Sequence, residues 1–181
     1  MSTRSKLFTT GAALAASIML CACDGSVRRE GPVEPLLRIT RTDAERNRLW
    51  ALDEKALTLY DKLNRRLLRR VILPEWVLAG EAHACAPDVV LDAAGAVFVS
   101  SNVVPVLWRV DPQSFEVTRI ALTLDSDRDK DVGFTGLSFA GDGTLIATGA
   151  TFPSQWRIDI GAARASKVAS SASLADALCG T

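Results

Sequence analysis

The sequence has few of the side chains that enzymes use for proton transfer near neutral pH. It contains one histidine, His83, and one tyrosine in 181 residues, whereas general acid–base catalysis most often depends on histidine. It also has no Gly-x-Ser-x-Gly nucleophile turn, phosphate-binding loop, His-Glu-x-x-His pair or Cys-x-x-Cys pair. The sequence therefore does not indicate a serine hydrolase, a P-loop nucleotide hydrolase or a zinc protease of the common types.

An excess of charge of either sign is also missing. The chain carries 21 basic and 21 acidic residues, so its overall charge does not attract nucleic acid. Hydrophobic residues make up 48% of the chain, which excludes wholesale disorder, and the length suits one domain rather than two. We expect a globular domain without a nucleic-acid partner.

The hydrophobic run near the N-terminus is too short to cross a bilayer comfortably. Residues Leu7–Leu20 carry no charge, but a spanning helix needs about 20 apolar residues. A short basic region, Arg4 and Lys6, precedes this run. A basic region followed by a short apolar stretch is typical of an export signal.

The segment Leu20-Cys21-Ala22-Cys23 closes this signal. It resembles the lipobox of bacterial lipoproteins, in which a leucine lies three residues before the modified cysteine and a small residue directly before it. Cys23 fits this pattern, whereas a modified Cys21 would place Leu20 at the small position. The resemblance implies cleavage before Cys23 and acyl chains on it, of which two or three anchor a protein stably where one would not. The alternatives are an ordinary secretory signal and an uncleaved anchor helix.

The same resemblance implies a lipid-anchored protein of the bacterial cell envelope that faces the periplasm. Asp24 follows the cysteine and resembles the inner-membrane retention signal of enteric bacteria, with the outer membrane as the alternative. Residues 24–35 are polar and rich in Gly and Pro, as in a flexible tether. We therefore predict a signal peptide over 1–22, the lipidated cysteine and tether over 23–35, and a folded domain over 36–181.

Two cysteines remain outside the signal, Cys85 and Cys179. An exported chain meets an oxidising compartment, where an even cysteine count favours a disulfide. Such a bridge would tie the C-terminal tail to the middle of the chain, closing a loop of roughly a hundred residues and stabilising the fold by up to a few kcal/mol. The alternative is two separate thiols.

Two segments of the domain align without a gap when the chain is shifted by 48 residues. The identical pairs are Gly95 with Gly143, Pro105 with Pro153, Trp108 with Trp156, Arg109 with Arg157 and Asp111 with Asp159. The apolar positions between these identities agree as well. Self-similarity at a fixed period indicates a repeat architecture.

Each unit alternates short apolar runs with turns such as Gly141-Asp142-Gly143, a pattern typical of β-hairpins. Four strands in roughly fifty residues resemble one blade of a β-propeller, of the broad class that includes NHL and YVTN repeats. The resemblance covers residues 87–170 and implies an all-β fold, but it carries no function with it.

A degraded third copy precedes these two. Leu49-Trp50-Ala51 lies 48 residues before Val97-Phe98-Val99, and Leu57–Asp61 lies 50 residues before Leu107–Asp111. Taken alone, however, residues 43–72 have leucines at helical spacing and predict an amphipathic helix. We favour strands, because tertiary context overrides local propensity where a blade must be completed.

The expected fold is therefore all-β, with about three blade-like four-stranded repeats after an N-terminal signal helix. Closed propellers need roughly four to eight blades, and an open array exposes sheet edges. Four arrangements are consistent with this count: a dimer that completes the ring, a protein partner against the open side, an open stack, or a fragment of a longer ancestor. The sequence does not choose among them.

The repeated tryptophan–arginine pairs are the first candidate site. Trp108 with Arg109 and Trp156 with Arg157 could form an aromatic and basic platform for a ligand. Because the pairs recur at the repeat spacing, we favour packing within each repeat, with the arginines paired to neighbouring carboxylates.

A second candidate is the acidic stretch that contains Asp125, Asp127 and Asp129. Alternating carboxylates resemble the start of a calcium loop. Lys130 replaces the turn glycine and Gly136 replaces the bidentate glutamate of that pattern, so we favour a solvated connector and expect no metal.

The third candidate is Glu81 with His83, close to Cys85. A metal site or an acid–base pair that uses imidazole would need His83, the single histidine. One His and one Glu are little for either role, and we favour a surface loop beside the disulfide.

We expect a membrane-anchored, non-catalytic binding or assembly module without a cofactor. The alternative is a metal-dependent hydrolase or lactonase of the propeller type. Such an enzyme needs carboxylates and a His or Asn that converge from several repeats, and the residues that offer themselves are Glu81, His83, Asp88 and Asn102.

Overall fold

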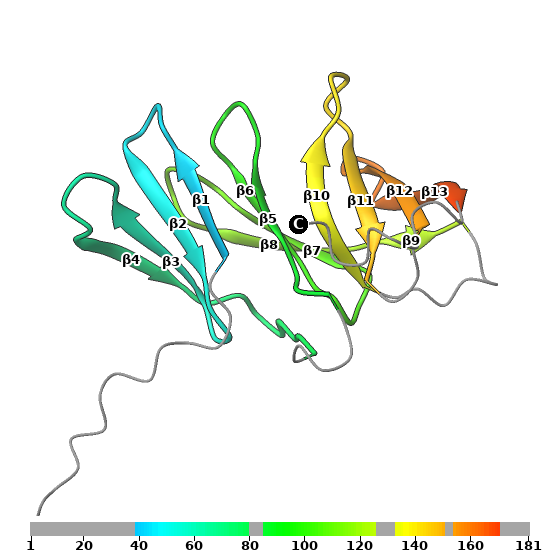
Figure 1. Ribbon diagram of the computed structural model, residues 1–181, viewed down its shortest axis with the longest axis horizontal. Helices are drawn as coiled ribbons and strands as arrows, with labels where there is room; N and C mark the ends of the chain where they lie inside the picture. Colours follow the sequence, from blue (N-terminus) through cyan, green and yellow to red (C-terminus); the bar gives the residue numbers. More distant parts are fainter. Residues whose placement is uncertain (1–38, 80–84, 126–132, 151–153, 171–181) are drawn as a thin grey trace, which may run out of the picture. The chain divides into compact units, whose positions relative to one another are not determined.

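The computed structural model describes residues 39–79, 85–125, 133–150 and 154–170. All of them belong to the unit that spans residues 34–181. The described chain is all-β: it forms three sheets and no helix (Figure 1). The all-β class is thus confirmed, whereas the expected signal helix over 1–22 lies outside the described residues.

The first sheet is an antiparallel meander. Its strands are β1 (Ile39–Asp43), β2 (Arg48–Leu52), β3 (Leu57–Asp61) and β4 (Leu67–Val71). The expectation of strands over 43–72 is confirmed, and the helical alternative is wrong. The helical pattern would have buried Leu63 and Leu67 on one stripe, but these side chains are 82% and 57% exposed. The helical spacing of these leucines therefore does not place them on one buried face.

The second and third sheets repeat this meander (Figure 1). The second consists of β5 (Val89–Leu91), β6 (Val97–Ser100), β7 (Val106–Val110) and β8 (Val117–Ala121). The third consists of β10 (Phe134–Phe139), β11 (Leu145–Gly149), β12 (Ser154–Asp159) and β13 (Arg164–Ser170). A fifth strand, β9 (Thr123–Leu124), follows β8 and pairs in parallel with β13, which the repeat pattern did not predict.

The first turn of each sheet keeps the period of 48 residues. Asn47, Gly95 and Gly143 occupy equivalent positions and all have positive φ, at 52°, 85° and 82°. Glycine adopts this conformation freely, and asparagine is among the side chains that tolerate it best. Asn47 therefore marks the first sheet as the third copy of the repeat.

The last turn of each sheet is closed by an aspartate. The side-chain oxygens of Asp61, Asp111 and Asp159 accept hydrogen bonds from backbone amides two or three residues later. In one of these turns the amides of Ser114 and Gln113 lower the pKa of Asp111, since they bond to its ionised form. Each turn then contains a residue with positive φ, namely Arg65, Phe115 and Ala163.

The second sheet contributes to two hydrophobic cores, one on each face. Because side chains alternate along a strand, Val97 and Val99 join the core shared with the first sheet, while Phe98 between them joins the core shared with the third sheet. Trp50 and Trp108 lie in the first core and Trp156 in the second, and all three are fully buried. Neighbouring repeats therefore depend on one another for burial of their apolar faces.

The connector between the first and second sheets is bonded to the second. The indole N–H of Trp108 donates to the Pro74 carbonyl at 2.7 Å, and that of Trp76 donates to the Ser100 carbonyl at 3.2 Å. The Ser101 hydroxyl donates to the Val77 carbonyl at 2.7 Å. Two of these bonds come from tryptophans, whose polar N–H usually has a hydrogen-bond partner when the ring is buried.

Candidate functional site

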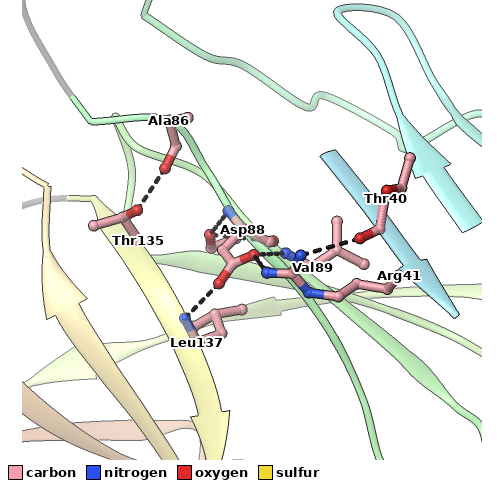
Figure 2. A network of polar contacts seen from close by, with 8 residues as sticks. Thr40, Arg41, Ala86, Asp88, Val89, Thr135 and Leu137 are labelled. Carbon is pink, nitrogen blue, oxygen red and sulfur yellow. Dashed lines mark hydrogen bonds and ion pairs between the residues drawn. The ribbon is translucent and has the colours of Figure 1, made fainter. Parts of the chain in front are cut away.

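A buried aspartate joins the three sheets (Figure 2). Asp88 directly precedes β5 and is 8% exposed. Its Oδ1 accepts from Arg41 Nη2 of β1 at 2.5 Å and from its neighbour Val89 N at 2.7 Å, while Oδ2 accepts from Leu137 N of β10 at 2.8 Å. A single carboxylate thus bonds to groups from each sheet.

The backbone around Asp88 is bonded as well (Figure 2). Its N–H donates to the Ser100 hydroxyl at 2.8 Å, and its carbonyl accepts from the Ser100 N–H at 3.0 Å. The Thr135 hydroxyl of β10 donates to the Ala86 carbonyl at 2.6 Å. A buried carboxylate is costly unless it is paired and hydrogen-bonded, and both oxygens of Asp88 meet this condition within the protein.

A second buried polar side chain, Asn102, holds the chain on both sides of residues 80–84. It is 3% exposed. Its Oδ1 accepts from Ala79 N at 2.9 Å, and its Nδ2 donates to the carbonyls of Ala79 at 3.0 Å and Cys85 at 2.9 Å. All three bonds are to backbone, so Asn102 holds Ala79 and Cys85, the described residues on either side of residues 80–84.

These bonds bear on the hydrolase alternative. Glu81 and His83 lie outside the described residues, while Asp88 and Asn102 direct their oxygens at protein N–H groups. In the part of the chain that the structure describes, no group of three or more His, Cys, Asp or Glu side chains could hold a metal ion. The geometry of the two described candidates is that of structural residues.

The repeated tryptophans occupy positions typical of packing residues. Trp108 and Trp156 are fully buried, and the Trp156 N–H donates to the Ser154 hydroxyl at 2.9 Å. The arginines differ from each other: Arg109 is half-buried, whereas Arg157 is exposed and pairs with Asp142 at 2.6 Å. Neither indole face is available to a dissolved ligand.

The remaining predicted residues are placed only in part. The exposed Asp125 follows β9, where its N–H donates to the Ala165 carbonyl and its Oδ1 accepts from Lys167 N, both at 3.1 Å. Asp125 thus extends the contact between β9 and β13. Cys85 is 5% exposed. The described residues do not include the four other predicted site residues, namely Cys23, Asp127, Asp129 and Cys179.

An open pocket of about 580 Å³ lies between the second and third sheets. We call it the 2–3 groove. Its apolar walls are Leu91, Phe98, Phe139 and Ile160, and its rim is formed by residues 92–94 and by Ala140, Gly141 and Gly143. The rings of Phe98 and Phe139 meet edge to face with centroids 5.5 Å apart.

The equivalent space between the first and second sheets contains two arginine side chains. Arg46 Nη2 donates to the Ala94 carbonyl at 2.6 Å, and Arg48 Nη1 donates to the Pro112 carbonyl at 2.7 Å. Phe115 packs beside them, with its ring centroid 6.3 Å from that of Trp50. The guanidinium carbons of Arg48 and Arg69 lie 5.6 and 4.9 Å from the Phe115 centroid.

The repeat alignment explains the difference between the two interfaces. A shift of 48 residues places Ala94 at the position of Arg46, Ala96 at that of Arg48 and Ala163 at that of Phe115. Three large side chains are thus replaced by methyl groups, and one of these alanines, Ala94, lines the 2–3 groove. The groove was not predicted from the sequence, although these three substitutions are visible when the repeats are aligned.

Two comparisons with known proteins assign the chain to no family. Comparison with protein families finds no family that matches it, and comparison with curated proteins finds no match either. In addition, the described residues contain no helix with the length and apolarity needed to span a bilayer. The function is therefore inferred from the site itself.

Proposed function

We propose that the protein is a lipid-anchored, non-catalytic binding module of the bacterial cell envelope. The export signal and the lipobox-like segment that ends at Cys23 support the anchor. The anchor would keep the domain on the periplasmic side of a membrane, and Asp24 favours the inner one. Three repeats would then present their surfaces to partners in that compartment.

The observation that carries the binding function is the 2–3 groove. It is open, and four apolar side chains line it, as is common in ligand-binding sites. The one ionisable side chain at its rim, Asp92, accepts a hydrogen bond from the Ala96 amide at 2.8 Å. The groove therefore offers apolar contact without a pair of groups for acid–base chemistry.

The neighbouring interface indicates what kind of group fits. There, an arginine stem and an aromatic ring fill the equivalent space. We propose that the 2–3 groove accepts an elongated apolar or aromatic group, such as a side chain of a protein partner.

We further infer that the three sheets are blades of a partial β-propeller. Support comes from the meander order within each sheet, the equivalent turns at Asn47, Gly95 and Gly143, and the cores shared between successive sheets. Because three blades are fewer than the four to eight of closed propellers, a second copy or a protein partner would complete the ring.

The groove can be tested by filling it. Nile red, an uncharged apolar dye, should bind the purified protein with enhanced fluorescence. Ala94→Arg should reduce this binding several-fold, because the new side chain would lie in the groove as Arg46 does in the neighbouring interface. Ala121→Arg is the matched control, since Ala121 is an exposed alanine of β8 outside the groove. Equal dye binding by both variants would exclude the 2–3 groove as the binding site.

The enzyme alternative is tested by metal analysis of the same protein. A stoichiometric divalent ion that survives dialysis would contradict the non-catalytic function. The proposed function predicts no stoichiometric ion, and it predicts that a chelator leaves the melting temperature unchanged.

A further inference from the structure

The outer strand of the first sheet combines exposed positive charge with exposed large apolar side chains. Residues 62–72, which we call the basic edge, comprise β4 and the turn before it. Five of these residues are cationic: Lys62, Arg65, Arg66, Arg69 and Arg70. The stretch contains no acidic residue, and all five cations are exposed.

The same stretch exposes large apolar side chains. Leu63 is 82% exposed, Leu67 57%, Leu68 41% and Ile72 63%. Two further large apolar side chains of the described residues are exposed, Val77 and Val168. Most of the exposed large apolar side chains of the described chain therefore belong to one short segment.

Protection of a sheet edge explains only part of this composition. β4 is the edge strand of its sheet, and cationic side chains and bulges are common means of preventing edge pairing. Both are present, since the pairing with β3 shifts register between Leu59 and Tyr60 and leaves Leu68 outside the ladder. Edge protection gives no reason for four exposed leucine and isoleucine side chains, which would favour aggregation unless something covers them.

Few of the cations are engaged within the described protein. Arg69 lies over the Phe115 ring with its guanidinium carbon 4.9 Å from the centroid. Arg70 approaches Asp53 at 3.9 Å, at a side chain that is 51% exposed, and an ion pair at such a site contributes little. The positive charge of the basic edge therefore remains available to an outside partner.

We propose that the basic edge binds the surface of an anionic lipid bilayer. Cations interleaved with leucines match such a surface, because the arginines meet lipid phosphates while the apolar side chains enter the headgroup region. This inference rests on the proposed anchor for its location. Residues 24–38 separate Cys23 from β1, and even when fully extended they reach about 50 Å, so the domain would stay close to the bilayer.

Membrane contact at the basic edge would also orient the domain. The 2–3 groove involves the second and third sheets, whereas the basic edge belongs to the first. A partner could therefore reach the groove while the first sheet holds the membrane. Lipid contact and partner binding would use separate surfaces of one small domain.

The test is co-sedimentation with vesicles of the chain from residue 23 onward, carrying Cys23→Ser. This protein keeps the whole unit of residues 34–181 and cannot be acylated at residue 23. It should bind vesicles that contain phosphatidylglycerol and should not bind vesicles of pure phosphatidylcholine. Raising the salt concentration from 0.05 to 0.5 M, roughly a tenfold change, should weaken the binding, because salt screens exposed charges.

Two double variants separate the contributions of charge and apolar surface. Arg65→Glu/Arg66→Glu and Leu67→Ser/Leu68→Ser should each lower the partition coefficient by roughly tenfold or more. The matched control is Arg164→Glu/Val168→Ser on β13, where both residues are exposed, and it should bind like the parent protein. Circular dichroism of each variant checks that the β-structure is kept.

Equal binding to both vesicle types, or unchanged binding by the basic-edge variants, would overturn the proposal. Self-association that the same variants abolish, without vesicle binding, would overturn it in favour of pairing between two copies. The anchor is tested separately by acyl labelling of Cys23. Failure of the anchor and failure of the basic edge would therefore be distinguishable.

Discussion

Arg46 bonds to the residue that takes its own place in the next repeat. Its Nη2 donates to the carbonyl of Ala94 at 2.6 Å, and Ala94 lies 48 residues further along, at the equivalent position. The first repeat thus reaches over the second with a long cationic side chain, whereas the second presents only a methyl group to the third. This asymmetry leaves Ala94 at the rim of the 2–3 groove.

Removal of the Arg46 side chain should weaken the junction of the first two sheets. Its guanidinium bonds to the Ala94 carbonyl and lies 3.4 Å from the Asp43 carboxylate, at 31% side-chain exposure. We expect Arg46→Ala to lower the free energy of unfolding by about 1–2 kcal/mol, the usual effect of one charge-assisted hydrogen bond. Urea denaturation measures this change. Nile red binding at the 2–3 groove should not fall, and a fall would show that the two interfaces are coupled.

Two glycines should respond very differently to the same substitution. A Cβ on Gly133 would lie 2.1 Å from the Asn102 carbonyl carbon and 2.3 Å from its oxygen. Because these are backbone atoms, one of the two chain segments must move, and we expect Gly133→Ala to cost about 3 kcal/mol, at the upper end for overpacking. A Cβ on Gly141 meets nothing within 4 Å, so Gly141→Ala should change stability by less than about 0.5 kcal/mol. Similar denaturation midpoints for both variants would contradict the close approach at Gly133.

Asp88 and Arg41 should contribute unequally to stability. Asp88→Ala leaves the buried amides of Val89 and Leu137 without their acceptor, which should cost about 2–3 kcal/mol. Arg41→Ala removes a side chain that is 42% exposed, and a pair at such a site contributes about 1 kcal/mol or less. A double-mutant cycle measured by urea denaturation separates the contribution of the Arg41–Asp88 ion pair to the free energy of unfolding from that of the amide hydrogen bonds. Equal losses for the two single variants would mean that the ion pair, rather than the amide bonds, dominates.

Features of the fold that depend on local sequence could be predicted, whereas features that depend on contacts between sheets could not. Repeat period, strand order and turns are local properties, so residues such as Gly95, Gly143 and Trp108 indicated them directly. Asp88 could be named only as an acidic residue, because its partners Arg41 and Leu137 come from other sheets and are 47 and 49 residues away.

Two further features depend on what a side chain does in space rather than on its type. The 2–3 groove is lined by Ala94, which stands where Arg46 crosses the preceding interface. An alignment shows this substitution but not how far the arginine side chain extends. The parallel strand β9 was not predicted because it is only two residues long. It is held by backbone hydrogen bonds from the Thr123 N–H to a carbonyl of the turn between β12 and β13, and from the Asp125 N–H to a carbonyl of β13. Backbone pairing of this kind leaves no periodic pattern of apolar residues.

The proposed anchor predicts which of two cysteines, Cys21 or Cys23, is modified. Cys23→Ser should abolish incorporation of labelled palmitate in cells, because the sulfur that would carry the diacylglycerol is lost. Cys21→Ser should leave labelling intact, because Cys21 is removed with the signal in the proposed cleavage. Gel fluorography of the labelled protein distinguishes the variants. Persistent labelling of Cys23→Ser would exclude this anchor and leave the basic edge to be judged by vesicle binding alone.

Asp142 should titrate well below an ordinary aspartate. The Thr144 hydroxyl and amide donate to its Oδ1 at 2.6 and 3.0 Å, and Arg157 Nη1 approaches its Oδ2 at 2.6 Å. These contacts lower the pKa of Asp142 from 3.8 to about 2, with the Thr144 hydroxyl as the largest cause.

The depressed pKa fixes the direction of the pH dependence. A carboxylate whose folded-state pKa is lowered stabilises the fold above its unfolded-state pKa and loses this contribution as the pH falls toward the folded value. The β10–β11 turn should therefore keep its Asp142 contacts above about pH 4 and lose them as the pH approaches 2. Carbon-13 NMR of the side-chain carboxyl group measures the midpoint. Thr144→Ala should raise it more than Arg157→Ala does, and an ordinary midpoint in the unmodified protein would contradict the bonding of this turn.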